Sequence, residues 1–239
     1  MDFGRDKPRT GEYSWVVTLR SLRMGWICSG VLISSRHVLT AAHCLFENYS
    51  GDAVLNKCGD RRLRWDQWFA LFGNDCAESA FCKRRWYRIS KIYYHEEYDP
   101  CTFDNDLALF VLSSDVPEDT ATPICIPNRF EEINRNLTAA GDGAAVADSL
   151  YSTRPHALPV RLVAAVSKHI LTVTVEGGGL CDGDSGGPLF QTMSDRNVLV
   201  GIMSRGISCE YENAADLFTD IRFYTRWTCE KSGVCTENY

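Results

Sequence analysis

The sequence predicts an all-β fold that ends in a helix, and three observations support this prediction. Short runs rich in β-branched and aromatic residues recur between turn residues, which is typical of antiparallel strands. The chain has 239 residues and is 45% hydrophobic, enough to bury the core of one large domain or two small ones. Near the C-terminus, Ile221, Tyr224 and Trp227 recur at helical spacing, which predicts a final helix.

The predicted strands follow one another along the chain. They cover residues 15–19, 30–33, 68–72, 89–94, 108–112, 161–167, 189–191, 198–203 and 217–220. The segment 39–44 is compatible with one helical turn. The proline-containing stretch 115–127 is the best candidate for a link between two halves, because no repeat or low-complexity tract marks another boundary.

Charge and cysteine content narrow the classes of function. A formal charge of −6 leaves no basic footprint for nucleic acid. No run approaches the roughly 18 apolar residues of a membrane span, and the first residues are no secretory leader, so a soluble mature segment is expected. Eleven cysteines without CxxC pairs or a histidine-rich ligand set indicate disulfides in an oxidising compartment, with neither a metal nor another cofactor. The sequons at Asn48 and Asn136 fit a secreted glycoprotein.

Three short motifs carry the candidate chemistry. Ser185 lies in Gly-Asp-Ser-Gly-Gly-Pro, His43 in Thr-Ala-Ala-His-Cys, and Asp106 in Asp-Asn-Asp-Leu-Ala-Leu. Taken singly, these residues fit an ordinary turn, a histidine packed beside a disulfide and a strand cap. Together they supply a base, an acid and a nucleophile in the order His, Asp, Ser.

With these motifs, the chain resembles the chymotrypsin/trypsin family of serine endopeptidases, from Trp15 to the last helical turn. The resemblance implies two packed six-stranded antiparallel β-barrels in one peptidase domain. Residues 1–116 would form the first barrel, with His43 and Asp106, and residues 117–239 the second, with Ser185 and the C-terminal helix. It implies a secreted endopeptidase that acts on proteins or peptides through an acyl-enzyme and meets protein inhibitors.

The resemblance also assigns a role to each residue. His43 would accept the Ser185 proton and return it to the leaving amine, while Asp106 holds the imidazole tautomer. The N–H groups of Gly183 and Ser185 would form the oxyanion hole. The remaining histidines match no motif and are assigned to surface or packing positions: His37, His95, His156 and His169.

Asp184 needs a cationic partner, because a buried unpaired carboxylate is costly. In the family this partner is the N-terminal amine released by zymogen cleavage, at a hydrophobic start. Here the chain begins Met1-Asp2-Phe3-Gly4. Three explanations stay open: a replaced first residue, a true start just upstream, or a chain that is never processed to an active form.

By the same resemblance, Cys28 would pair with Cys44 and Cys181 with Cys209. The other pairings stay open, with short loops for Cys76 and Cys82 and for Cys229 and Cys235, and a contact across the cleft for Cys58 and Cys101. Cys125 is then left over. It matches a position that tethers a cleaved propeptide or upstream domain, and a buried free thiol is the alternative.

The specificity pocket departs from that of trypsin. Gly179 stands at its floor, where trypsins carry an aspartate, while the alignment puts Asp216 in the opposite wall. We therefore expect a broad preference that includes Lys and Arg, with a surface aspartate in a shifted register as the alternative. Ser204 and Gly206 match the strand that pairs with extended substrate, and Arg205 between them replaces a tryptophan.

A second function from another class is a catalytically inactive homologue that regulates proteins by binding them through the same cleft. The intact motifs favour catalysis, whereas the unusual start and Arg205 favour the binder. Asp142 stands where the family has tryptophan, and the segment 161–181 is shorter than usual, which predicts a more open cleft rim. An α/β-hydrolase is disfavoured, because its histidine comes last along the chain.

Overall fold

The computed structural model describes residues 12–22, 27–46, 68–72, 85–143, 155–175, 179–206 and 215–236. Sequences rich in valine, leucine, isoleucine and aromatic residues form its strands. The first group is β1 (Val16–Ser21), β2 (Ile27–Ser34), β3 (His37–Thr40), β4 (Trp68–Phe72), β5 (Arg85–Tyr94) and β6 (Ala108–Leu112). A 3₁₀ turn, η1 (Ala42–Leu45), follows β3.

The second half of the chain repeats this architecture. Its strands are β7 (Asn136–Gly141), β8 (His156–Val166), β9 (His169–Thr174), β10 (Pro188–Thr192), β11 (Asn197–Arg205) and β12 (Ala215–Asp220). The chain then enters η3 (Ile221–Tyr224) and the helix α1 (Thr225–Ser232). Ile221, Tyr224 and Trp227 are buried, so the predicted helical face is confirmed.

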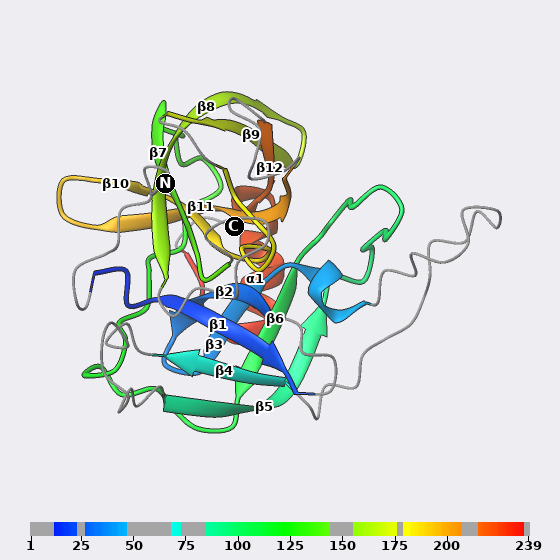
Figure 1. Ribbon diagram of the computed structural model, residues 1–239, viewed down its shortest axis with the longest axis vertical. Coiled ribbons are helices and arrows are strands. Elements are labelled where there is room, and N and C mark those ends of the chain that lie inside the picture. The colour runs from blue at the N-terminus through cyan, green and yellow to red at the C-terminus, as the bar shows by residue number, and fades with distance from the viewer. Residues whose placement is uncertain are drawn as a thin grey trace.

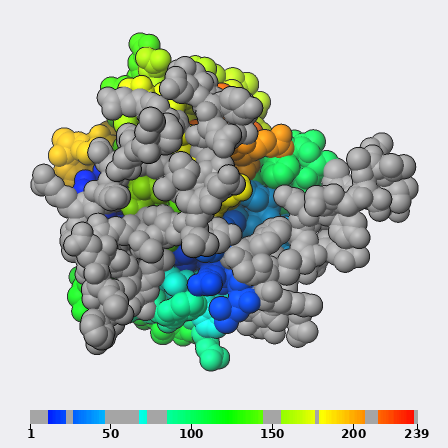
Figure 2. Space-filling view, viewed as in Figure 1, coloured from blue at the N-terminus to red at the C-terminus, as the bar shows by residue number. Residues whose placement is uncertain are grey.

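Each group of strands closes into an antiparallel barrel. The order is β1-β2-β3-β6-β5-β4 in the first barrel and β10-β11-β12-β9-β8-β7 in the second. The barrels lie one above the other in the view of Figure 1, and in Figure 2 the cyan surface around β4 lies toward the lower end and the yellow-green surface of the second barrel toward the upper end. The predicted fold of two six-stranded barrels with a C-terminal helix is confirmed.

Alternating burial explains why these segments fold as strands. In β9 every second residue is buried, and in β5 Tyr87 and Ile89 point inward between exposed neighbours. Closure leaves no open sheet edge. The large side chains that fill the interior include Trp68, Phe72, Phe110, Phe190 and Phe218.

The barrels meet through aromatic and polar contacts. Tyr13 and Trp15, before β1, lie with ring centroids 5.1 and 5.6 Å from that of Phe190 on β10. The Thr18 hydroxyl on β1 donates to the Asp142 carboxylate after β7. The connection between barrels runs through residues 113–135, and the expected division after residue 116 falls within it. In the ranges described, no helix has the length and apolar character needed to cross a bilayer.

Candidate active site

His43 lies on η1, directly after the buried strand β3. Ala42, Cys44 and Leu45 of this turn are buried, whereas the side chain of His43 is 14% exposed. A disulfide between Cys28 on β2 and Cys44 fixes the turn against the barrel. The ring and the two sulfurs lie within 4.8 Å of one another, but the disulfide leaves no thiolate to bind a metal.

Asp106 presents a fully buried carboxylate to this histidine. Its Oδ2 lies 2.7 Å from His43 Nδ1, and its Oδ1 accepts the backbone N–H of His43 at 2.8 Å. The Ser204 hydroxyl, at the end of β11, donates to Oδ2 at 2.6 Å. Because a carboxylate only accepts hydrogen bonds, Nδ1 carries a proton. In the neutral imidazole, Nε2 is then free to accept a proton.

The loop that carries Asp106 is held by the other barrel and by η3, a feature that the motif alone did not reveal. Asn105 has a φ of 55°, and its side-chain oxygen accepts from Lys168 Nζ at 2.7 Å and from the Tyr224 hydroxyl at 3.0 Å. The Thr219 hydroxyl on β12 donates to the Asp106 carbonyl at 3.0 Å. The acid of the first barrel is therefore positioned by the second.

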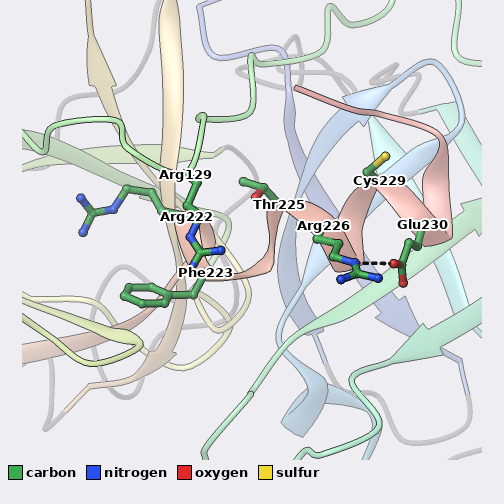
Figure 3. A pocket seen from close by; sticks show the side chains of 7 residues that line it. All are labelled: Arg129, Arg222, Phe223, Thr225, Arg226, Cys229 and Glu230. Atoms are coloured by element: carbon green, nitrogen blue, oxygen red, sulfur yellow. Dashed lines mark hydrogen bonds and ion pairs between the residues drawn. The ribbon is translucent and has the colours of Figure 1, made fainter. Parts of the chain in front are cut away.

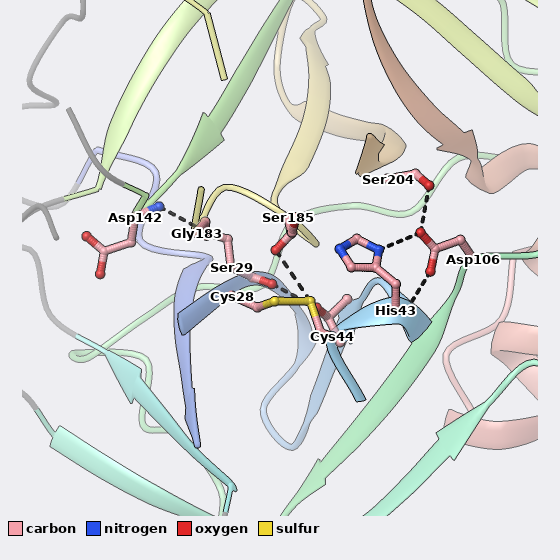
Figure 4. Close-up of a disulfide and its surroundings, with 10 residues drawn as sticks. Cys28, Ser29, His43, Cys44, Asp106, Asp142, Gly183, Ser185 and Ser204 are labelled. Carbon is pink, nitrogen blue, oxygen red and sulfur yellow. Dashed lines mark hydrogen bonds and ion pairs between the residues drawn. A yellow bond between two sulfur atoms is a disulfide. The ribbon is translucent and has the colours of Figure 1, made fainter. Parts of the chain in front are cut away.

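Ser185 lies in the turn between residue 181 and β10, and it is partly exposed. Its carbonyl oxygen accepts the N–H of Ser29 on β2 at 2.8 Å, which places the serine beside the His43 turn (Figure 4). The carbonyl of Gly183, whose φ is 98°, accepts from the Ser29 hydroxyl at 2.8 Å. Within the described ranges, no hydrogen bond joins the Ser185 hydroxyl to His43; such bonds are often long in unliganded enzymes.

His156 also lies beside the candidate site, in contact with the residue that precedes Ser185. It was assigned to a surface or packing position, and it is buried, with Nε2 3.2 Å from the carboxylate of Asp184. Asp184 is itself fully buried. No sequence motif marked His156. The chain start that was expected to meet Asp184, residues 1–4, lies outside the described residues.

Asp216 on β12 is 2% exposed, so the alternative of a surface aspartate is wrong. A Cβ on Gly206 would lie 2.9 Å from its Oδ1 and 3.5 Å from the carbonyl of Leu180, the neighbour of Gly179. Asp216, Gly206 and the segment of Gly179 and Leu180 therefore lie close together. Oδ2 of Asp216 has no hydrogen-bond partner among the described residues. Burial, and secondarily the charge of Asp184, raises the pKa of Asp216 to about 7.

The remaining cysteines and sequons are partly described. Cys229 and Cys235 form a disulfide, Cys101 and Cys181 are disulfide-bonded, and Cys125 is an exposed free thiol. An exposed position overturns the alternative of a buried thiol. Asn136 is exposed at the start of β7. Several candidates lie outside the described residues: Asn48, Cys58, Cys76, Cys82 and Cys209.

A separate pocket of about 460 Å³ lies along α1, away from these residues (Figure 3). It is lined by Arg129, Arg222, Phe223, Thr225, Arg226, Cys229 and Glu230. Two of its arginines are already paired: Arg222 with the buried Asp220, and Arg226 with Glu230 at 2.7 Å. It holds none of the candidate catalytic side chains.

Comparisons with known proteins agree with this arrangement. "Serine protease filzig" of Drosophila melanogaster is 31% identical over 94% of this chain, which spans 14% of that protein. "Trypsin" of Phaedon cochleariae is 28% identical over 93% of the chain and 85% of its own length. "Inactive CLIP domain-containing serine protease A3" of Aedes aegypti is 27% identical over 91% of the chain and 48% of its own length. The sequence profile of the Trypsin family matches residues 2–228, and the chain therefore belongs to the trypsin family of serine proteases.

Proposed function

We propose that this chain is a secreted serine endopeptidase that cleaves peptide bonds through an acyl-enzyme on Ser185. The observation that carries the proposal is the buried Asp106 carboxylate, which holds His43 Nδ1 at 2.7 Å in the turn beside the segment of Ser185. This pairing leaves Nε2 as the basic nitrogen. A histidine packed only for stability has no need of a buried charge on one nitrogen.

In the proposed reaction, the Ser185 hydroxyl attacks the scissile carbonyl while His43 Nε2 takes its proton. The tetrahedral oxyanion is received by the N–H groups of Gly183 and Ser185, and each such donor is worth about 3 kcal/mol of barrier. His43 then protonates the leaving amine, and water hydrolyses the acyl-enzyme by the same route. Asp106 stabilises the imidazolium that forms between these steps.

The test is labelling with a fluorophosphonate, followed by active-site counting. We expect stoichiometric modification at Ser185, with no labelling of Ser185→Ala. The His43→Ala variant should label slower by about three orders of magnitude, since the base is removed. A folded wild-type protein that stays unlabelled contradicts the proposal.

For specificity, we propose that Asp216 allows cleavage after Lys and Arg while the Gly179 floor admits apolar side chains. The support is the position of Asp216 Oδ1 against Gly206, on a strand next to the substrate-pairing segment. Ser204 and Gly206 would pair with the substrate backbone. A peptide library should show turnover after Lys and Arg that falls in Asp216→Gly; unchanged turnover after these residues contradicts the assignment.

Secretion, zymogen processing and glycosylation at Asn48 and Asn136 belong to the same proposal, as do a propeptide or upstream segment linked to Cys125 and recognition by protein inhibitors. The exposed thiol of Cys125 supports a tether. Mass analysis of the protein secreted from expressing cells, with and without reduction and glycosidase treatment, tests these points. A reduced mass equal to the non-reduced mass overturns the tether.

The second candidate function is a protein-binding regulator without catalysis. It is favoured by the similarity to the Aedes aegypti protein, which is named inactive, and by Arg205 in the substrate-pairing strand. Correctly folded protein that binds a protein inhibitor of serine proteases but resists fluorophosphonate would support this function.

A further inference from the structure

His156 and Asp184 form a buried polar contact beside the candidate nucleophile. His156 is the first residue of β8, pairs with Gly141 of β7, and has a side chain that is 6% exposed. Its Nε2 lies 3.2 Å from both carboxylate oxygens of Asp184. Asp184 directly precedes Ser185, so whatever fixes its side chain acts one residue from the reacting hydroxyl.

Among the described residues, donors to the Asp184 carboxylate come from at least three separate segments. Oδ1 accepts the N–H of Gly143 at 2.9 Å, and Oδ2 accepts the N–H of Cys181 at 2.8 Å. His156 adds a donor from β8. The carboxylate is closely packed against β7, since a Cβ on Gly141 would lie 2.3 Å from Oδ1. A fully buried carboxylate depends on such donors, because each lost hydrogen bond to a buried charge is costly.

The backbone of Asp184 also takes part in the turn that holds Ser185. The N–H of Asp184 donates to the Cys181 carbonyl at 3.0 Å, and its own carbonyl accepts from Gly187 at 2.8 Å. With both backbone and carboxylate fixed, the peptide groups on either side of Asp184 have little freedom to rotate. These are the groups that connect Gly183 to Ser185.

We propose that His156 is a positioning residue for catalysis: by donating from Nε2 to Asp184, it holds the Gly183–Ser185 turn in the geometry that receives the oxyanion. The inference rests on the proposed function of Ser185. A carboxylate only accepts, so Nε2 must carry a proton, as it does in one neutral tautomer and in the imidazolium. The contact joins a residue of the second barrel's sheet to the turn, and it acts together with the other donors to Asp184.

Kinetics of three variants test the role. His156→Leu removes the donor, His156→Asn keeps an amide but shortens the reach, and His156→Gln places an amide N–H near the position of Nε2. We expect kcat per titrated active site to fall at least about tenfold in the Leu and Asn variants, a part of the 10²–10³ that a full oxyanion donor supplies. KM should stay within about threefold, and Gln should recover most of kcat.

A peptide aldehyde, which forms a tetrahedral adduct, should lose affinity in parallel with kcat, while a product peptide should not. His37→Leu is the matched control, because His37 lies on β3 and pairs with Ser34 at 2.8 Å. A folded Leu or Asn variant with wild-type kcat and aldehyde affinity overturns the proposal, as does a Gln variant that is no better than Asn.

A measurement without substitution at His156 reads the contact directly. In the full chain labelled with ¹⁵N-histidine and carrying Ser185→Ala, we expect His156 Nε2 to bear a proton. An unprotonated Nε2 overturns the proposal even if the Leu variant fails to fold. Failure of the proposed function is distinguishable: the wild-type protein would then resist fluorophosphonate, whatever the state of His156.

Discussion

Arg205 stacks on the ring of Phe103, with 4.2 Å between its guanidinium carbon and the ring centroid. The same ring lies 5.7 Å from the centroid of the His43 imidazole. Phe103 has a φ of 64°, so the loop before Asp106 turns its side chain into this position. A cation from the second barrel and an aromatic ring from the first thus lie next to His43, the proposed base.

Arg205→Trp should improve the binding of substrates with apolar residues upstream of the scissile bond. An indole in place of the guanidinium adds an aromatic contact of about 0.5–1.5 kcal/mol, which corresponds to a KM lower by about two- to tenfold. Peptides with Phe or Ala two to four residues upstream measure this effect. The control is Arg196→Trp on the exposed turn between β10 and β11. An equal decrease of KM in both variants would contradict a contact between residue 205 and the upstream part of the substrate.

Asp216 should make stability depend on pH. Its pKa is raised to about 7 in the folded protein, by burial first and by Asp184 second. The folded state therefore keeps a proton that the unfolded chain releases near pH 4, so this contribution is complete below about pH 4 and is lost as pH rises through 7. In urea unfolding, Asp216→Asn should gain about 1–4 kcal/mol over the wild type between pH 4 and pH 8. The exposed Asp195→Asn should show no such gain.

The charge of Asp216 should also tune selectivity. We expect the ratio of kcat/KM for a Lys substrate to that for a Leu substrate to rise as pH increases through about 7, because the carboxylate then becomes charged. Taking the ratio cancels the protonation of His43, which affects both substrates alike. A ratio that does not change between pH 5.5 and 8.5 would contradict a role of Asp216 in the specificity pocket.

Ser204→Ala should slow catalysis without unfolding the protein. It removes the 2.6 Å hydrogen bond to Asp106 Oδ2, while the two contacts from His43 remain. A hydrogen bond to a charged group is worth about 1.5–3 kcal/mol, so we expect kcat to fall by about tenfold or more. Ser232→Ala removes a hydroxyl hydrogen bond to the Thr228 carbonyl on α1, away from Asp106, and is the control. Equal losses in both variants would assign the effect to packing.

Gly186→Ala should destabilise the turn that holds Ser185. The residue has a φ of 82°, and a Cβ there would lie 2.1 Å from Thr40 Oγ1 and 2.4 Å from the Ser29 carbonyl. Gly233 has a φ of 75° with open space around it, so Gly233→Ala should cost only about 1 kcal/mol. Thermal unfolding should show a clearly larger loss for Gly186→Ala. Comparable melting temperatures would mean that the turn adjusts.

Runs of β-branched and aromatic residues predicted most of the strands, a helical period predicted the final helix, and the resemblance to a known family implied the two barrels. β4 and β6 were predicted at the observed bounds, 68–72 and 108–112. β3, β7 and β9 were not predicted. Each mixes histidine, threonine or asparagine with apolar residues, and its strand conformation depends on neighbours distant in sequence.

At the candidate site, motifs indicated the residues proposed to act directly, but not the residues that contact them. The motifs named His43, Asp106 and Ser185, while Phe103 and His156 contact these residues or their neighbours only through tertiary packing. Phe103 lies three residues before Asp106, yet its ring meets a side chain of the other barrel. Such contacts have no local sequence pattern.

The hydrogen bond from Ser29 on β2 to the Ser185 carbonyl has a consequence for assembly. Ser185 is anchored through its carbonyl by the half of the chain that carries His43, so under the proposed function its labelling should report whether the two halves have docked. Expressed as separate fragments, neither half would hold a competent site. When the two fragments are mixed, fluorophosphonate labelling of Ser185 should return only if they associate. Labelling would therefore measure fragment complementation.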